Sequence, residues 1–326
     1  MTRAADRHRI VPSSGAAPSA TRRGLLCGTA MAAAFGWSRP AGGSPAPGPR
    51  VSPLVRRVPS TGQEMPVIGL GSWITFNVGR DPEALARSTQ VVSDFLAAGG
   101  RVIDSSPMYG SSQDTIGHAL TRLGRQASVF SAEKVWIGDG ASGPAQIEQT
   151  RQRWGVPRLD LVQIHNLLAW REHLPRLLEM KAAGRIGAVG VSTSEGRRHA
   201  ELETILRTQP VDVVQLSYNL LDRDVESRLL PLARERNIAV LVNRPFRQGA
   251  LLRDLSRHPL PGWAPEIGCT HWAQVALKFV VSHPAVTCVI PATSQPLHVR
   301  QNMAAGHGPW PDEALRRRMA ADVAAL

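Results

Sequence analysis

Eight short apolar runs recur along this chain with helix-forming segments between them, and this cadence limits the folds that the chain can adopt. The intervals contain apolar residues at helical spacing, and glycines such as Gly99, Gly100 and Gly124 end two of the predicted helices. Repeated strand–helix units predict a parallel sheet covered by helices. The predicted strands begin near Pro66, Arg101, Val129, Leu159, Ile186, Val213, Ile238 and Thr287.

The even spacing of these units favours a closed sheet. Eight units within about 250 residues, with no second domain, predict a (β/α)8 barrel over residues 51–326. An open, doubly wound sheet is the alternative. The seventh interval is the longest and contains a Pro- and Arg-rich loop over about 244–265, which we expect to be functional because loops of that length in compact domains usually are.

The first fifty residues differ in composition from the rest. They contain seven Arg and one acidic residue, and so hold +6 of the formal charge of +12. A basic segment over 1–23, an uncharged apolar segment over 25–37 and a Pro-, Gly-, Ser- and Ala-rich segment over 38–50 follow one another, as in a cleaved export signal. The pair Arg22-Arg23 before Leu25-Leu26 resembles a twin-arginine signal; a disordered tail with a chance Arg pair is the alternative.

This resemblance predicts an exported, periplasmic protein that uses the twin-arginine machinery, with residues 1–50 as signal peptide and flexible linker. The twin-arginine route carries folded proteins, and it suits proteins that acquire a cofactor before crossing. The signal therefore suggests a bound cofactor.

Composition excludes several other classes of function. The charge of +6 on residues 51–326 is spread over short clusters without a basic, aromatic-rich stripe, so we expect no nucleic-acid partner. No uncharged run reaches the roughly 18 apolar residues of a spanning helix, so we expect no stable membrane insertion. Three scattered cysteines predict neither a disulfide framework nor a zinc module. The sequence contains no His-x-His or His-Glu-x-x-His motif, so we expect no metal site.

Polar side chains end several of the predicted strands, where a barrel of this type carries its active site. They are Asp104 with Tyr109 close behind, Glu133-Lys134, Gln163-Ile164-His165, Ser192, Gln215-Leu216-Ser217 and Asn243-Arg244. We therefore expect polar and titratable groups to converge on one rim.

The rarity of Lys and Tyr makes two of these positions informative. Only three Lys stand among 38 basic residues, and only two Tyr occur in the chain, yet Lys134 and Tyr109 both fall at the predicted rim. Considered separately, Lys134 and Asp104 would be interpreted as a buried ion pair, and Tyr109 as an aromatic residue in a surface loop. Together with His165 they predict a general acid, in which the ammonium lowers the pKa of the phenol and the histidine orients a carbonyl oxygen.

Several motifs, in order along the chain, resemble those of the aldo-keto reductase family, and the resemblance covers about residues 54–303. They are Met65-Pro66-Val67-Ile68-Gly69-Leu70-Gly71-Ser72-Trp73, Val102-Ile103-Asp104 with Tyr109-Gly110, Glu133-Lys134, Gln163-Ile164-His165, Gln215-Leu216-Ser217-Tyr218-Asn219-Leu220-Leu221-Asp222-Arg223, and Ile290-Pro291-Ala292-Thr293-Ser294 followed by Gln301-Asn302.

The resemblance implies a (β/α)8 barrel that binds NADPH along its rim and reduces an aldehyde or ketone. It implies that Tyr109 is the proton donor, that Lys134 and Asp104 tune it, and that His165 orients the carbonyl. Trp73 and Trp136 follow predicted strands and are therefore candidates for the lining of the substrate pocket, with a core position as the alternative for Trp73. Implied cofactor-binding residues are Ser192, Gln215, Asn243, Arg244, Pro245, Phe246, Thr293, Ser294, Gln301 and Asn302.

This chain departs from the family pattern at three cofactor positions. Thr193 follows Ser192 where many members have Asn, Asn243-Arg244-Pro245 replaces an aromatic residue, and His298 replaces an Arg that often holds the 2′-phosphate. NADPH is the expected cofactor, with NADH as the alternative. A non-catalytic nucleotide-binding partner protein or redox sensor is the rival function, and a metal-dependent lyase or hydrolase is a third.

Overall fold

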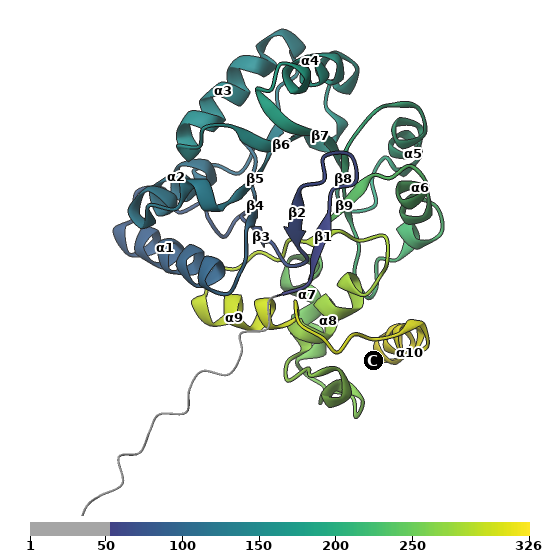
Figure 1. Cartoon of the computed structure of the whole chain (residues 1–326). Helices are drawn as coiled ribbons and strands as arrows, with labels where there is room; N and C mark the ends of the chain where they lie inside the picture. Colours follow the sequence, from purple (N-terminus) through teal and green to yellow (C-terminus); the bar gives the residue numbers. More distant parts are fainter. Residues whose placement is uncertain (1–52) are drawn as a thin grey trace, which may run out of the picture. The chain divides into compact units, whose positions relative to one another are not determined.

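The computed structural model describes residues 53–326, and its centre is a sheet of eight parallel strands (Figure 1). Strands that follow one another along the chain are neighbours in the sheet. Two further parallel bridges, Ile68 to Val289 and Gly71 to Ala292, join the first strand to the last, so the sheet closes. The strands are β3 (Leu70–Gly71), β4 (Val102–Asp104), β5 (Phe130–Val135), β6 (Leu159–Ile164), β7 (Ile186–Ser192), β8 (Val213–Ser217), β9 (Ala239–Asn243) and β10 (Cys288–Val289).

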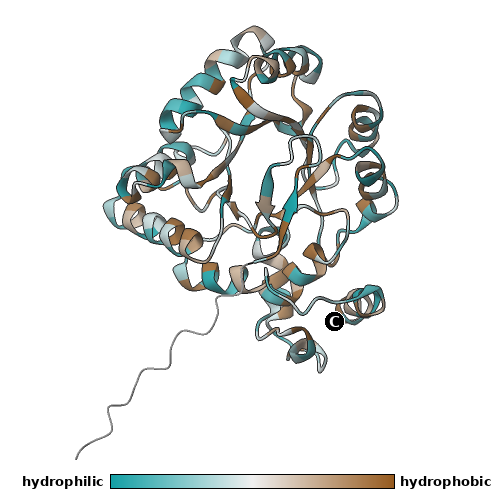
Figure 2. Ribbon diagram, in the orientation of Figure 1, coloured by the Kyte–Doolittle hydropathy of each residue, from teal (hydrophilic) through white to brown (hydrophobic). Residues whose placement is uncertain are grey.

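Helices surround this barrel and show their hydrophilic residues on the outside (Figures 1 and 2). At least one helix separates each strand from the next, which is the (β/α)8 arrangement. The helices are α1 (Pro82–Ala97), α2 (Ser112–Leu123), α3 (Gly143–Trp154), α4 (Trp170–Ala182), α5 (His199–Thr208), α6 (Leu229–Glu235), α7 (Ala250–Leu255), α8 (Trp272–Val281), α9 (Pro296–Ala304) and α10 (Glu313–Ala324).

The hydrophobic core has two parts, which the strands separate. The larger cluster lies between the strands and the helices and includes Val162 and Val189. The smaller cluster fills the barrel interior and includes Leu161 and Ala188, because successive residues of a strand point to opposite faces. Most of the strands are therefore apolar on both faces over much of their length, as buried parallel strands are, whereas β5 also carries Ser131, Glu133 and Lys134.

A hairpin of β1 (Val55–Arg57) and β2 (Glu64–Pro66) precedes the barrel. Its Val58 and Met65 are fully buried and belong to the cluster inside the barrel, together with residues from the early part of the strands such as Val102 and Phe130. The hairpin therefore closes the amino-terminal end of the barrel. The strands finish at the opposite end, where barrels of this type carry their active sites.

Local sequence explains where two of the helices begin and end. The side chain of Asp81 accepts hydrogen bonds from the backbone nitrogens of Glu83 (2.9 Å) and Ala84 (3.1 Å), and Pro82 occupies the first turn, so α1 has a capped start. Gly124 ends α2 with φ of 61°, a left-handed conformation that glycine adopts without strain.

The predicted barrel is confirmed, and the open doubly wound sheet is wrong because the bridges from Ile68 and Gly71 close the sheet. Two details of the prediction also need correction. Pro66 ends the hairpin strand β2, and the first barrel strand is β3 at Leu70. The region 244–265 is not one long loop, because it contains α7 and short 3-10 segments.

Residues 53–326 contain no helix that is both long enough and apolar enough to cross a membrane. The predicted signal, with Arg22-Arg23, lies outside the described residues.

Candidate active site

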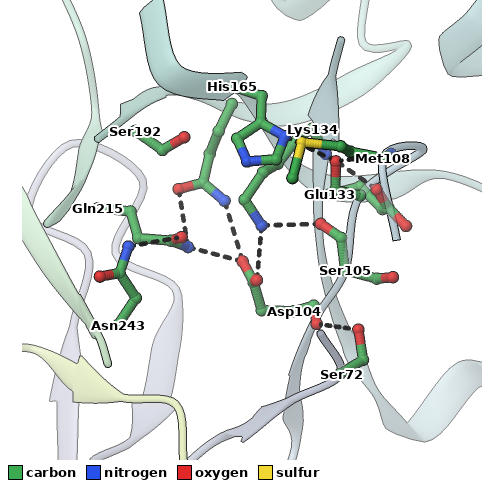
Figure 3. Close-up of polar contacts among 12 residues, drawn as sticks. Ser72, Asp104, Ser105, Met108, Glu133, Lys134, His165, Ser192, Gln215 and Asn243 are labelled. Atoms are coloured by element: carbon green, nitrogen blue, oxygen red, sulfur yellow. Dashed lines mark hydrogen bonds and ion pairs between the residues drawn. The ribbon is translucent and has the colours of Figure 1, made fainter. Parts of the chain in front are cut away.

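The barrel interior changes from apolar to polar at the carboxyl ends of the strands. Above Val102, Leu161, Val213 and Leu241, the inward-facing positions are occupied by polar side chains, which are buried except for the half-buried Asn243. Figure 3 shows these side chains converging from several strands around one carboxylate. The set comprises Asp104, Lys134, Gln163, Ser192, Gln215 and Asn243.

Asp104 and Lys134 form an ion pair at the centre of this layer, with Nζ 2.6 Å from Oδ2. Both side chains are almost wholly buried, so each needs further partners. Gln215 (2.7 Å) and Gln163 (3.2 Å) donate to the other oxygen of Asp104, and Lys134 also donates to the carbonyl of Ser105 at 2.8 Å (Figure 3). Burial lowers the pKa of Lys134, but Asp104, Tyr109 and Glu133 together outweigh it, so the pKa is raised and the ammonium stays charged.

Tyr109 lies next to this pair. The Lys134 ammonium is 5.2 Å from the centroid of the Tyr109 ring, and the His165 ring meets the same ring edge to face at a centroid distance of 5.6 Å. Burial raises the pKa of Tyr109, and Lys134 only partly offsets this, so the net direction is upward. The expectation of a lowered pKa is therefore wrong, because burial of the phenol outweighs the ammonium; Tyr109 holds its proton at neutral pH.

His165 completes the predicted tetrad. Its Nδ1 is 2.8 Å from Oγ of Ser106. Burial, together with the nearby Lys134 ammonium, lowers the pKa of His165 to about 3. The imidazole is therefore neutral at physiological pH and suits a hydrogen-bonding role better than a proton-donating one.

Two of the predicted cofactor residues continue the hydrogen-bonded layer away from Asp104. Asn243 donates to Oε1 of Gln215 (3.3 Å) and to the carbonyl of Thr193 (2.9 Å), while Ser217 donates to Asn243 at 2.6 Å. Ser192 accepts from the backbone nitrogen of Asn166 at 3.2 Å. Gln215 therefore contacts both the tetrad and the predicted cofactor side of the rim.

The segment after β9 contains the other three cofactor candidates of that region. Arg244 is ion-paired with Glu195 from the loop after β7, at 2.9 Å, so its charge already has a partner. Pro245 is buried, and Phe246 packs in the larger hydrophobic cluster.

The remaining cofactor candidates lie between β10 and the end of α9. The Thr293 hydroxyl accepts from the backbone nitrogen of Gln295 at 3.0 Å, just before α9 begins. Ser294 follows it, half-buried, and Gln301 (half-buried) and Asn302 (buried) lie near the end of the helix. Arg300 of the same helix pairs with Asp94 of α1 at 2.5 Å.

The two predicted pocket tryptophans follow the first and third barrel strands. Trp73 is half-buried, two residues after β3, and Trp136 is 41% exposed, directly after β5. Met108, the residue before Tyr109, is also exposed. Apolar side chains therefore reach solvent from three consecutive loops of the rim.

Sequence reasoning missed two side chains that the structure places in the site. Gln163 is part of a quoted motif, but only its inward-facing register shows that it serves Asp104; Gly190 on the neighbouring strand leaves it room, since a Cβ there would lie 2.9 Å from its Cγ. Ser106 follows Asp104 by two residues, and nothing in the sequence indicates its contact with His165.

Residues 53–326 contain no cluster of three or more His, Cys, Asp or Glu side chains that could hold a metal ion.

The fold and the tetrad define the class of protein. The sequence model of the Aldo/keto reductase family matches residues 67–321, and the chain belongs to that family of enzymes.

Similar proteins agree with this assignment. The chain is 26% identical over 245 residues to the methylglyoxal reductase YeaE of Escherichia coli, covering 74% of this chain and 85% of the relative. It is 25% identical over 300 residues to an NADH-specific methylglyoxal reductase of the same organism, covering 73% and 89%. A crystal structure of an aldo/keto reductase from Klebsiella pneumoniae in complex with NADP and acetate shares the fold, with a TM-score of 0.69, 24% identity and coverage of 80% and 93%.

Proposed function

We propose that this protein reduces an aldehyde or ketone to an alcohol with NADPH, and that Tyr109 donates the proton. The observation that carries the proposal is the contact of the Tyr109 ring with both Lys134 and His165. Lys134, held by Asp104 at 2.6 Å, is a cation near the phenol ring, and His165 is a neutral hydrogen-bonding group whose ring meets the phenol ring edge to face.

The residues have separate roles in this reaction. When bound, NADPH supplies the hydride. As the carbonyl carbon accepts it, the carbonyl oxygen gains negative charge, which a hydrogen bond from His165 stabilises. The Tyr109 hydroxyl then protonates that oxygen, and the Lys134 ammonium stabilises the phenolate left behind. Since Asp104 is bound by Lys134, Gln163 and Gln215, it keeps the ammonium in place.

The rim offers polar groups suited to the cofactor. Oγ1 of Thr193, directly after Ser192, is a buried polar atom without a hydrogen-bond partner among the described residues. Gln215 and Asn243 lie beside it. The amino terminus of α9, preceded by Thr293 and Ser294, suits a phosphate, because helix starts present unpaired N–H groups.

The relatives suggest the first substrate to try. Two similar proteins from Escherichia coli are named methylglyoxal reductases, one of them NADH-specific. A small 2-oxoaldehyde such as methylglyoxal is therefore our test substrate, with either nicotinamide cofactor.

The test is a steady-state assay of methylglyoxal reduction with the wild type and Tyr109→Phe. The substitution keeps the ring and removes the proton, so turnover should fall by about 10²–10⁴-fold while the fold is preserved. A Tyr109→Phe variant with wild-type turnover would show that Tyr109 is not the acid. A wild type that binds NADPH but reduces no carbonyl would favour the rival function, a nucleotide-binding partner protein or redox sensor.

We also propose that residues 1–50 direct folded export to the periplasm by the twin-arginine route. The arrangement of basic, apolar and small residues and the pair Arg22-Arg23 support this proposal. Replacing both arginines with lysine should retain the protein in the cytoplasm, as measured by cell fractionation. Normal export of the double variant would contradict a twin-arginine signal.

A further inference from the structure

Ser106 is the one side chain, among the described residues, that is hydrogen-bonded to His165. Its hydroxyl oxygen lies 2.8 Å from Nδ1 of the imidazole, and the serine itself is fully buried. The same oxygen accepts a hydrogen bond from the backbone nitrogen of Met108 at 3.2 Å. Ser106 therefore touches both the imidazole and the turn that leads to Tyr109.

The direction of the bond between Ser106 and His165 follows from the needs of the hydroxyl. A serine hydroxyl has one proton to donate, and a buried proton without an acceptor is costly. Within residues 53–326, Nδ1 of His165 is the acceptor in reach of this hydroxyl, because its other partner, the Met108 nitrogen, is a donor. The arrangement that satisfies every group has Oγ–H of Ser106 donating to an unprotonated Nδ1.

This direction fixes the tautomer of His165. A neutral imidazole has one N–H, and a proton excluded from Nδ1 must lie on Nε2. The ring is neutral because its pKa is lowered to about 3, first by burial and then by Lys134. Nε2 has no hydrogen-bond partner among the described residues, and so its N–H is available to a ligand.

We propose that Ser106 is a positioning residue that locks His165 in the Nε2–H tautomer, so that the imidazole can only donate a hydrogen bond to the substrate carbonyl. The inference rests on the proposed carbonyl reduction. With the other tautomer, the lone pair of Nε2 would face the carbonyl oxygen and repel the charge that develops on it. A lock of this kind matters most when the oxygen is most negative, which is at the transition state.

The experiment combines nitrogen NMR with kinetics on the whole chain. The wild type, labelled with ¹⁵N-histidine, is measured at pH 7, with the His165 signals assigned through their loss in His165→Gln. We expect one tautomer, protonated on Nε2. In Ser106→Ala we expect both tautomers, and a kcat for methylglyoxal about tenfold lower with little change in KM, equivalent to about 1.4 kcal/mol.

Two further variants separate positioning from simple packing. Ser106→Thr keeps the hydroxyl and should restore the Nε2–H tautomer and most of kcat. Ser112→Ala is the matched control, because Ser112 is also a fully buried serine and shares its hydroxyl hydrogen bond (2.9 Å) with Ser105, away from His165. It should change neither the tautomer nor kcat.

A wild type with the proton on Nδ1 would overturn the proposal, and so would a folded Ser106→Ala that keeps the single Nε2–H tautomer. If Ser106→Ala fails to fold, the spectra of the wild type and of Ser106→Thr test the proposal instead. Both should show the Nε2–H tautomer, and a proton on Nδ1 in either protein would overturn the proposal. The tautomer is read without turnover. An inactive wild type with the expected tautomer would therefore refute the proposed substrate chemistry and leave the role of Ser106 supported.

Discussion

The indole nitrogen of Trp154 donates a hydrogen bond of 2.8 Å to Oε1 of Glu133, the residue before Lys134. Gln113 donates to the same oxygen at 3.0 Å, and the backbone nitrogen of Lys134 donates to the other at 2.9 Å. Glu133 points outward from β5, toward the helices, while Lys134 points into the barrel. A buried carboxyl group and the ammonium of the site are therefore held by adjacent residues of one strand.

Glu133 should make stability depend on pH. Burial raises the pKa of Glu133 from 4.5 to about 7, although its hydrogen bonds oppose the shift. The folded state therefore binds this proton more tightly than the unfolded state, so the resulting stabilisation is complete below pH 4.5 and is lost as the pH rises to about 7. The loss should reach up to about 3 kcal/mol.

Urea denaturation between pH 4.5 and 8 measures this effect, with Glu133→Gln as the comparison. The glutamine cannot titrate, so the free energy of unfolding should fall less steeply with pH in the variant than in the wild type. Parallel curves would mean that Glu133 does not titrate in this range.

Lys134→Met should impair both activity and stability. The phenolate formed at Tyr109 loses its stabilising cation, and we expect turnover to fall by about 100-fold or more. Asp104 loses its ion-pair partner in a buried site, which should cost about 3 kcal/mol of unfolding free energy, because Gln163 and Gln215 still donate to the carboxylate. Methylglyoxal reduction and urea denaturation measure the two effects.

Lys181→Met is the control for that variant. Lys181 also pairs with a buried aspartate, Asp212, at 2.7 Å, but it lies near the end of α4, just before β7 begins. The Lys181→Met variant should lose stability and keep the turnover of the wild type. If Lys134→Met kept wild-type turnover, the ammonium would have no part in the proton transfer.

Tyr218→Phe should separate the two tyrosines of the chain. The hydroxyl of Tyr218 donates to Glu226 and accepts from Arg316 of α10 at 2.7 Å, and the ring is fully buried. Without the hydroxyl, Glu226 and Arg316 each lose a hydrogen bond, so we expect the free energy of unfolding to fall by about 1–3 kcal/mol, measured by thermal unfolding. Turnover should stay near that of the wild type; a large fall would bring Tyr218 into the reaction.

NADPH should bind more tightly than NADH, but only about tenfold. Arg244 and Arg300, two arginines near the predicted phosphate site, are already paired with Glu195 and Asp94. The exposed His298 is therefore our candidate ligand for the 2′-phosphate. Fluorescence titration of the wild type and His298→Gln measures both affinities. The variant should bind the two cofactors equally, and equal binding by the wild type would contradict a 2′-phosphate site.

The sequence predicts the barrel well because its signals are local and repeated. Strand starts at Leu159, Ile186 and Val213 agree with the structure, since each follows a helix stop and begins an apolar run. The prediction places the first strand at Pro66, because Met65 and Pro66 of the hairpin strand β2 begin the apolar run that continues to Leu70 of β3. The pairing of residues 55–57 with residues 64–66 depends on the three-dimensional structure, and the spacing of apolar residues along the sequence does not predict it.

The candidate site, like the barrel, could be predicted only in part from the sequence. Asp104, Lys134, Tyr109 and His165 could be predicted because rare residue types fall at strand ends. The contact of Ser106 with His165 spans 59 positions and joins two strand ends, and so it needs coordinates. The raised pKa of Tyr109 also needs coordinates, because it depends on how deeply the ring is buried.

The chain of hydrogen bonds from Asn243 through Gln215 to Asp104 has a consequence for how such an enzyme can change. Gln215 gives one end of its amide to Asn243 and the other to the carboxylate that holds Lys134. A substitution at Asn243 or Gln215, two of the predicted cofactor residues, therefore also alters the hydrogen bonds that support Lys134 beside the proposed proton donor, Tyr109. Evolution toward a new coenzyme along this side of the rim would have to re-optimise the acid at the same time.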